Sequence, residues 1–287
     1  MTYVYTWQFR VRSNETDPDL RVRPAVLQTY LEETAIQGSA SLGYDYAWYR
    51  ANQRVWVARH IHVRYYTLPV YGDDLTMHTW VSDAKHVQSH REYDLRRTVD
   101  DAPMLRGRCN WVYLDTQTMR PTKLIPEFHE RFDPSGHLES LNLDLPDAVP
   151  LLSRATYSET RRVAYHEVDG AHHVNNTVYA GWSEATITNA LREMGWTPQT
   201  LRQKGLWWQP YSRRIDFQRS AQDGDFLRLT VQPVALSPTG IDWRTTIQHA
   251  ERGDTFVVDH LALTLMEGNT PVSLPESLRS AVQSDHT

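Results

Sequence analysis

Residues 17–32 of the chain read DPDLRVRPAVLQTYLE, and residues 169–184 read DGAHHVNNTVYAGWSE. Sliding the chain by 152 positions, the difference between 17 and 169, superposes the two stretches without a gap. Over about 60 residues, the same shift matches these pairs: Asp17/Asp169, Val22/Val174, Val26/Val178, Glu32/Glu184, Gly43/Gly195, Trp56/Trp208, Gly72/Gly224, Asp73/Asp225 and Leu75/Leu227. Because one register holds over that length, the sequence predicts an internal duplication.

Within each copy the hydrophobic period changes in the same order. Apolar residues recur at helical spacing from Leu27 to Ala35 and from Tyr179 to Met194, and the two runs stop near Gly43 and Gly195. After each glycine the period falls to two, which predicts strands. The alternating residues are Ile61 to Tyr65, Leu75 to Val81, Tyr93 and Leu95, and Cys109 to Tyr113, then Ile215 and Phe217, Leu227 to Val231, Trp243 to Ile247, and Leu261 to Leu265. Each copy is therefore predicted as one long helix followed by an antiparallel sheet, an α+β arrangement.

The length of 287 residues fits two domains of roughly 150 residues each. We expect the first copy at residues 1–125 and the second at residues 159–287. Between them, residues 126–158 are predicted to form a linker, because Pro146 and Pro150 break the periodicity there.

Composition excludes several classes of protein. The single cysteine, Cys109, cannot form an internal disulfide, and zinc sites built on several thiolates are excluded. Thirty Lys and Arg against 35 Asp and Glu give a net charge of -5, which offers nucleic acid no overall basic field. The N-terminus does not resemble a signal peptide, and no apolar run approaches the ~18 residues of a membrane span. We therefore expect a cytoplasmic protein with no nucleic-acid partner and no membrane insertion.

The densest polar cluster, Tyr165 to Asn176, immediately precedes the second predicted helix. Asp169 and His173 would lie in the turn that leads into the helix, with free backbone N–H groups near Asn176 and Thr177 pointing into the same space. A carboxylate, an imidazole and donors for an oxyanion are what attack on a carbonyl requires. The alternative is an ordinary turn and helix cap. Adjacent histidines on an extended segment point apart, so no metal or cofactor is predicted.

The pattern Asp169-x-x-x-His173-Val174-Asn175-Asn176-x-x-Tyr179-x-x-Trp182 resembles the signature of the hotdog-fold acyl-acyl carrier protein (acyl-ACP) thioesterases, plant and bacterial enzymes that end fatty-acid synthesis. Further segments resemble the first hotdog of that family: Glu15-Thr16-Asp17, Tyr30 to Ala35, Pro69 to Asp73, and Trp111 to Asp115 with Arg120-Pro121. The resemblance covers about residues 5 to 266, in the order of the family.

The resemblance implies a tandem, or double, hotdog that hydrolyses the thioester between a fatty acyl chain and the phosphopantetheine arm of acyl carrier protein. Asp169 and His173 match the catalytic positions, and amides beside Asn176 would polarise the thioester carbonyl. The chain departs from the family at Ala171, where an Asn is usual, and at Ser220 and Ala221, where plant members carry Glu-Cys. A thiol nucleophile is thereby excluded, which leaves water assisted by Asp169 and His173, or a transient anhydride.

Other residues are assigned by position. Ala171, Thr177, Ser220 and Trp208 are predicted to contact substrate, and Glu184 is a possible orienting acid. The following arginines are candidates for a basic face toward an acidic carrier protein: Arg91, Arg96, Arg97, Arg213, Arg214 and Arg219.

The two copies differ where the chemistry is expected. The first copy has Arg21 in place of His173, and Arg23-Pro24 in place of Asn175-Asn176. We therefore expect a structural or acyl-pocket role for the first half, although Asp17 with Glu32 could form a second acid site.

Three readings of function stay open beside the leading one. The substrate could be an acyl-CoA, or a polyketide or aryl thioester, and the protein could instead bind acyl groups without catalysis, with Asp169 merely capping the helix. The sequence is compatible with a monomer or a homodimer and does not determine the acyl chain length.

Overall fold

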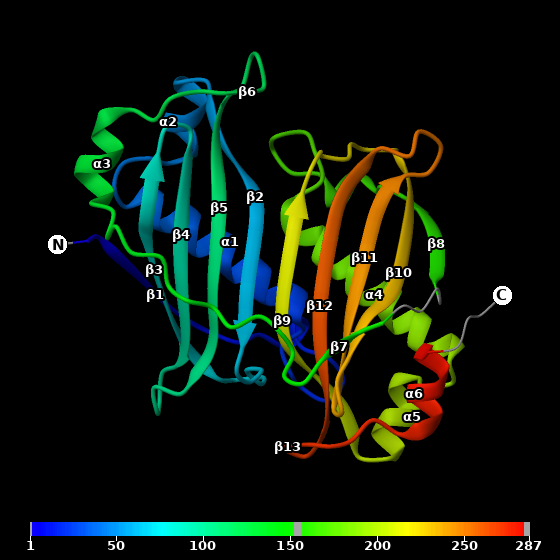
Figure 1. Ribbon diagram of the computed structural model, residues 1–287. Coiled ribbons are helices and arrows are strands. Elements are labelled where there is room, and N and C mark those ends of the chain that lie inside the picture. Colours follow the sequence, from blue (N-terminus) through cyan, green and yellow to red (C-terminus); the bar gives the residue numbers. More distant parts are fainter. Residues whose placement is uncertain (1, 152–155, 284–287) are drawn as a thin grey trace. The chain divides into compact units, whose positions relative to one another are not determined.

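The computed structural model describes residues 2–151 and 156–283. By the contacts between residues, the chain divides into two compact units, Met1–Asn142 (unit 1) and Leu143–Thr287 (unit 2). In each unit a long helix lies against an antiparallel sheet (Figure 1). This is the α+β arrangement that the hydrophobic periods predict for each copy.

Unit 1 begins with an edge strand that precedes the long helix. Its elements are β1 (Val4–Arg10), η1 (Ser13–Glu15), α1 (Pro24–Ala40), α2 (Tyr46–Ala51), β2 (Arg54–Tyr65), β3 (Asp74–Lys85), β4 (Gln88–Arg97), β5 (Pro103–Asp115), β6 (Arg120–Pro121) and α3 (Pro126–Phe132). The strands form an antiparallel sheet in the order β1-β3-β4-β5-β2, and β6 pairs with β5.

Unit 2 repeats this order. Its elements are β7 (Val149–Pro150), β8 (Tyr157–Arg162), η2 (Tyr165–Glu167), α4 (Asn176–Glu193), α5 (Pro198–Gln203), β9 (Leu206–Phe217), β10 (Phe226–Leu236), β11 (Gly240–His249), β12 (Thr255–Glu267), β13 (Thr270–Pro271) and α6 (Glu276–Gln283). Strands β10, β11, β12 and β9 are neighbours in that order, β7 and β8 both pair with β10, and β13 pairs with β12.

The shift of 152 residues also relates the elements of the two units. Adding 152 to the bounds of α2, β2, β4 and β5 gives the bounds of α5, β9, β11 and β12. Both long helices end before a glycine with positive φ, Gly43 at 86° and Gly195 at 80°. Glycine adopts this left-handed conformation at little cost, which explains why the helices stop there.

Two helices lie in segments that the sequence did not assign to either sheet-and-helix body. Helix α3 falls within residues 126–158, the predicted linker, and it buries Phe128 and Phe132 in a cluster of unit 1. Helix α6 falls in the polar C-terminal tail and buries Leu278 and Val282 in the core of unit 2. The two helices hold corresponding places in the repeat, so each unit carries its own C-terminal helix.

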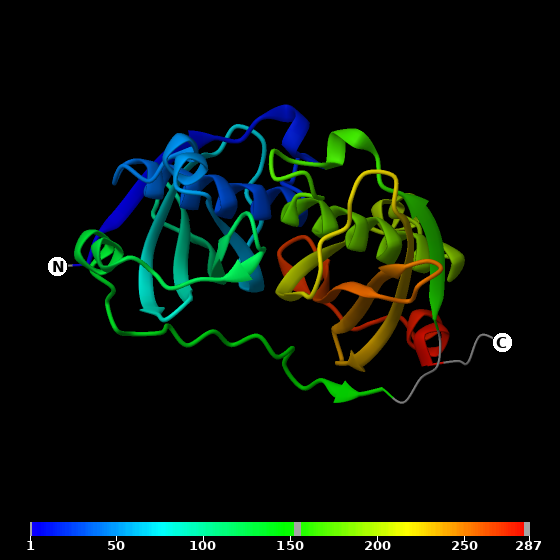
Figure 2. The ribbon, with the colours of Figure 1, turned by 90° about the horizontal axis from the view of Figure 1, so that it is seen from above.

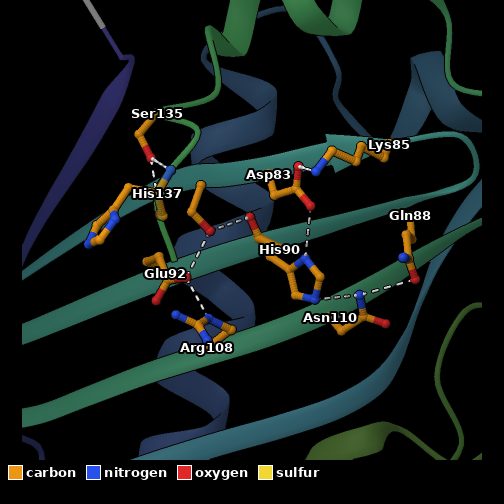
Figure 3. A network of polar contacts seen from close by, with 10 residues as sticks. Asp83, Lys85, Gln88, His90, Glu92, Arg108, Asn110, Ser135 and His137 are labelled. Carbon is orange, nitrogen blue, oxygen red and sulfur yellow. Dashed lines mark hydrogen bonds and ion pairs between the residues drawn. The ribbon is translucent and has the colours of Figure 1, made fainter. Parts of the chain in front are cut away.

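The outer face of the unit 1 sheet, opposite α1, carries paired polar side chains (Figure 3). Glu92 on β4 is 1% exposed and accepts hydrogen bonds from Ser82 Oγ at 2.8 Å and Arg108 Nε at 2.6 Å. The segment after α3 runs along this face, where the Gly136 N–H donates to the Ser82 carbonyl at 2.9 Å (Figure 2). Charges buried on the outer face are therefore satisfied by neighbours.

Among the described residues, no helix is both long and apolar enough to span a bilayer.

Candidate active site

Residues 163–175 connect β8 to α4 and are named here the α4 entry loop. The Asp169 N–H donates to the His173 carbonyl at 3.0 Å, and the His172 N–H donates to the Asp169 carbonyl at 3.0 Å. His172 has a φ of 62°, the left-handed conformation that closes this tight turn. The turn brings residues 169 and 173 to the same side, as the sequence predicts for a loop that leads into the helix.

The side chains of Asp169 and His173 are close and partly exposed. Asp169 Oδ1 lies 3.8 Å from His173 Nδ1, and the two side chains are 31% and 20% exposed. Asp169 Oδ1 also accepts the Ala171 N–H at 2.8 Å, and Asp169 Oδ2 lies 3.4 Å from Asn175 Nδ2. His173 Nδ1 lies 3.3 Å from the Val174 carbonyl oxygen. His173 Nε2 has no hydrogen-bond partner within the described part of the chain.

Asn175, rather than Asp169, caps α4. The Asn175 Oδ1 atom accepts the Thr177 N–H at 2.9 Å and the Thr177 hydroxyl at 2.7 Å. Thr177 is 8% exposed, so its predicted contact with substrate is replaced by a buried role in the cap. Of the two backbone donors expected at the helix start, the Thr177 N–H is thus occupied. Asn176 is the first residue of α4, at the positive end of the helix dipole.

A third acid, Glu167, fastens the loop from behind and was not singled out in the sequence. Glu167 Oε2 accepts the Ala164 N–H at 2.8 Å, and Oε1 accepts the Trp182 indole N–H at 2.9 Å. Burial alone would raise the pKa of Glu167, but these hydrogen bonds and the Arg161 guanidinium hold it below its ordinary value. The matching position in the first copy is also Glu, which was the available signal.

Three other predicted substrate contacts lie in different surroundings. Ala171 is exposed and contributes its N–H to Asp169. Ser220 is exposed next to Ala221, whose carbonyl accepts the Val174 N–H at 2.8 Å, so Ser220 borders the α4 entry loop.

Trp208 packs against the apolar cluster around the C-terminal half of α4. It lies nine residues before Phe217 on β9, roughly 30 Å along the strand, whereas Phe217 packs near Tyr179 close to the start of α4. The structure therefore does not bring Trp208 to the entry loop.

Glu184, expected as a possible orienting acid, belongs to a buried ionic network. Arg213 is fully buried, and its Nη1 lies 2.6 Å from Glu184 Oε1 while its Nη2 lies 2.6 Å from Asp259 Oδ2. Arg213 Nη2 also donates to the Ala180 carbonyl at 2.8 Å. The network ties α4 to strands β9 and β12 beneath it.

In unit 1, the proposed second acid site is not assembled. Asp17 Oδ1 accepts the Asp19 N–H at 2.8 Å and the Arg21 N–H at 2.9 Å. Glu32 lies on α1, and among the described residues no hydrogen bond or ion pair joins it to Asp17. Asp17 serves the turn, and the two carboxylates do not form a pair.

The predicted basic face is also wrong, because its arginines are buried or matched to acids. Arg91 and Arg213 are 6% and 0% exposed. The remaining four are paired with nearby carboxylates: Arg96 with Asp94 and Asp101, Arg97 with Asp100, Arg214 with Asp144, and Arg219 with Asp254. A search of the described residues finds no group of three His, Cys, Asp or Glu placed to hold a metal ion.

Comparisons with known proteins point to one family. Residues 2–132 match the family model of the acyl-ACP thioesterase N-terminal domain. The chain is 24% identical over 195 residues to oleoyl-acyl carrier protein thioesterase 1 of Arabidopsis thaliana, covering 62% of this chain and 53% of that protein. It is 23% identical over 284 residues to thioesterase 2 of that plant, covering 91% and 73%.

Two solved structures share the fold. A putative oleoyl thioesterase from Lactobacillus plantarum superposes with a TM-score of 0.77 at 16% identity, covering 96% of this chain and 98% of that one. An acyl-ACP thioesterase from Bacteroides thetaiotaomicron gives 0.68 at 16% identity, covering 91% and 97%. The tandem hotdog fold and the resemblance to acyl-ACP thioesterases are thereby confirmed. The aligned part of the chain spans about half the length of Arabidopsis thioesterase 1.

Proposed function

We propose that this chain, a relative of the acyl-ACP thioesterases, hydrolyses the thioester of a fatty acyl group carried by acyl carrier protein. The observation that carries the proposal is the α4 entry loop, where Asp169 Oδ1 lies 3.8 Å from His173 Nδ1. Both side chains are partly exposed at the positive end of α4. A carboxylate, an imidazole and a helix N-terminus in one turn provide the groups needed for attack on a carbonyl.

His173 acts as the general base in this proposal. With Nδ1 protonated, the ring donates to the Val174 carbonyl, whose oxygen lies 3.3 Å away, and Nε2 keeps its lone pair. Nε2 takes a proton from water as the water oxygen attacks the thioester carbon. The C–S bond then breaks, and the imidazolium returns the proton to the departing thiolate. Asp169 stabilises the imidazolium, which lies within ion-pair distance.

The negative charge on the tetrahedral intermediate is assigned to the start of α4. The Thr177 N–H is held by Asn175 Oδ1 at 2.9 Å, so we assign the role of donor to the Asn176 amide. The helix dipole adds to this stabilisation because Asn176 is the first residue of α4. Asn175 therefore positions the helix start, while Asn176 serves the substrate.

We further propose acyl carrier protein rather than coenzyme A as the carrier, and a cytoplasmic location. The family match and the curated relatives support the carrier, since the relatives bear acyl carrier protein in their names. The lone, buried Cys109 suits a reducing compartment. Each unit contains a complete hotdog, so a monomer satisfies the proposal and a homodimer remains compatible with it.

The test is thiol release from purified protein given acyl-ACPs and acyl-CoAs of several chain lengths, with aryl and polyketide thioesters in the same panel. We expect hydrolysis with the highest kcat/KM on an acyl-ACP. Saturable acyl binding with no thiol release would contradict the enzymatic proposal. A higher kcat/KM on aryl or polyketide thioesters would move the assignment to that substrate class.

A further inference from the structure

Arg91 is a buried cation without a buried partner. It lies on the inner face of β4 under the C-terminal end of α1 and is 6% exposed. Its Nη2 donates one long hydrogen bond to Ser39 Oγ at 3.3 Å, and its guanidinium lies 5.4 Å from the centre of the Phe132 ring. Arg91 forms no ion pair with any carboxylate of the described residues. Buried charges in proteins are almost always paired, because removing a charge from water is costly.

Other polar atoms beside Arg91 also lack partners. Tyr93 Oη on β4 and Trp111 Nε1 on β5 are buried without a hydrogen bond among the described residues. Tyr93 lies two residues from Arg91 on the same face, and Trp111 lies two residues beyond Cys109, which is opposite Arg91 in the ladder. Together Ser39, Arg91, Tyr93 and Trp111 are named here the Arg91 cluster. The cluster holds more donors than its own acceptors satisfy.

The groups around Arg91 do not supply a negative charge near neutral pH. Burial raises the pKa of the Cys109 thiol and of the Tyr93 phenol, and it raises the pKa of Tyr49 to about 12. The carboxylate of Glu32 on α1 acts on Tyr93 and Cys109, but Arg91 forms no ion pair with it. Arginine keeps its proton in proteins, so the positive charge persists.

The matching region of unit 2 shows that the fold does not require polar residues here. The shift of 152 residues relates Arg91 to Trp243, Ser39 to Leu191, Cys109 to Leu261 and Trp111 to Leu263. All four residues of unit 2 belong to its apolar core cluster. Unit 1 therefore departs from a hydrophobic solution that the same architecture accepts.

The outer face of the same strand shows how unit 1 treats buried charges that have partners. Glu92, next to Arg91 in sequence, pairs with Arg108 at 2.6 Å and accepts a hydrogen bond from Ser82 at 2.8 Å (Figure 3). Two neighbouring charged residues on β4 thus differ in kind, one matched and one left with spare donors.

We propose that the Arg91 cluster binds a carboxylate, and that this carboxylate is carried on the acyl group at the end remote from the thioester. The proposal rests on the proposed function, in which the first half serves acyl binding. A guanidinium binds a carboxylate through two parallel hydrogen bonds, and the Tyr93 hydroxyl and Trp111 indole provide further donors. The preferred substrates are then ω-carboxyacyl thioesters rather than plain fatty acyl thioesters.

The first test compares two thioesters of equal chain length, octanoyl and 7-carboxyheptanoyl, on the same carrier with the full-length protein. We expect wild type to favour the carboxylated substrate in kcat/KM by about tenfold or more. Arg91→Met should reverse this preference. Arg96→Met is the matched control, because Arg96 lies on the same strand and pairs outward with Asp94 and Asp101, and it should keep the wild-type ratio. An unchanged ratio in Arg91→Met, or a wild-type preference for octanoyl, would overturn the proposal.

The second test is independent of catalysis and measures thermal unfolding. Without ligand, Arg91→Met should unfold at a higher temperature than wild type, because the variant no longer buries an unpaired charge. Monomethyl suberate, which has one free carboxylate, should stabilise wild type but not Arg91→Met. If no thioester is hydrolysed while this difference in binding appears, the proposed function fails and the anion site stands. If octanoate stabilises wild type as much as monomethyl suberate, the carboxylate belongs to a free fatty acid and the substrate assignment is wrong.

Discussion

The entry loops of α1 and α4 share a backbone and differ in their side chains. In unit 1 the Asp17 N–H donates to the Arg21 carbonyl at 2.8 Å, and Leu20 has a φ of 63°. In unit 2 the corresponding bond is 3.0 Å, and His172 has a φ of 62°. The acid behind each loop is also kept, since Glu15 accepts from the Tyr30 hydroxyl at 2.8 Å as Glu167 does from Trp182.

This comparison separates scaffold from chemistry. An aspartate at the head of the turn is retained in both loops, where it accepts backbone N–H groups, so the aspartate alone does not identify a catalytic site. What unit 2 adds is His173 beside the carboxylate and Asn175 as the cap of the helix. We infer that catalysis depends on these additions, made on a loop that both copies need for folding.

The largest expected effect comes from replacing the added histidine with its counterpart in unit 1. His173→Arg should lower kcat for thioester hydrolysis by roughly 10²- to 10⁴-fold, because the general base is lost. Steady-state thiol release measures the effect, with circular dichroism to verify folding. The mirror change, Arg21→His, should leave kcat within a factor of about two. Comparable losses in both variants would place the difference between the loops outside catalysis.

A large effect on stability is expected from the ionic network under α4. Arg213→Ile introduces the residue found at the matching position of unit 1, Ile61, and leaves Asp259, 1% exposed, without its partner. The free energy of unfolding should fall by about 3–5 kcal/mol, measured by denaturant titration. Adding Asp259→Gly, the residue that unit 1 has at position 107, should recover part of this loss. A double variant less stable than Arg213→Ile would show that the buried charge is not the cause.

An intermediate effect is expected from removing the charge of the shared aspartate. Asp169→Asn keeps an oxygen for the Ala171 N–H but removes the carboxylate that lies 3.8 Å from His173. We expect kcat to fall roughly 10- to 100-fold, since the imidazolium loses its partner charge. Asp17→Asn, the same change in unit 1, should not alter kcat. Equal rates for wild type and Asp169→Asn would remove Asp169 from the mechanism.

The smallest effect concerns the helix cap. Asn175→Ala removes the acceptor of the Thr177 N–H, whose hydrogen bond is 2.9 Å long, and should cost about 1 kcal/mol of unfolding free energy. Arg23→Ala at the cap of α1 is the control, because Arg23 makes no side-chain cap hydrogen bond. Chemical unfolding of both variants gives the comparison, and an equal loss in the two would show that Asn175 adds nothing as a cap.

Much of the fold could be predicted because the hydrophobic periods are strong and occur twice. Both long helices and the eight longest strands follow from them. Strand β8 gave little signal, since its partly buried positions include Glu159 and Arg161. Helix α6 was hidden in a polar tail, where Leu278 and Val282 supply its buried contacts.

The candidate site was predictable only as a group of residues near one helix start. The sequence brought Asp169 and His173 together through the repeat and the family resemblance. It could not distinguish the cap from the catalytic acid, because Asp and Asn both cap helices and only the geometry shows Asn175 bonded to Thr177. Arg91 and Arg213 were expected at the surface from their charge. Their phase, two residues before Tyr93 and Ile215, indicated burial instead.

The central claim, that the working site is the α4 entry loop and the α1 loop is its scaffold copy, is tested by one comparison of rates. Thiol release from acyl-ACP is measured for wild type, for Asp169→Asn with His173→Arg, and for Asp17→Asn with Arg21→His. The account predicts release at the uncatalysed rate for the first double variant and at the wild-type rate for the second. Wild-type release by the first double variant, or loss of release by the second alone, would contradict it.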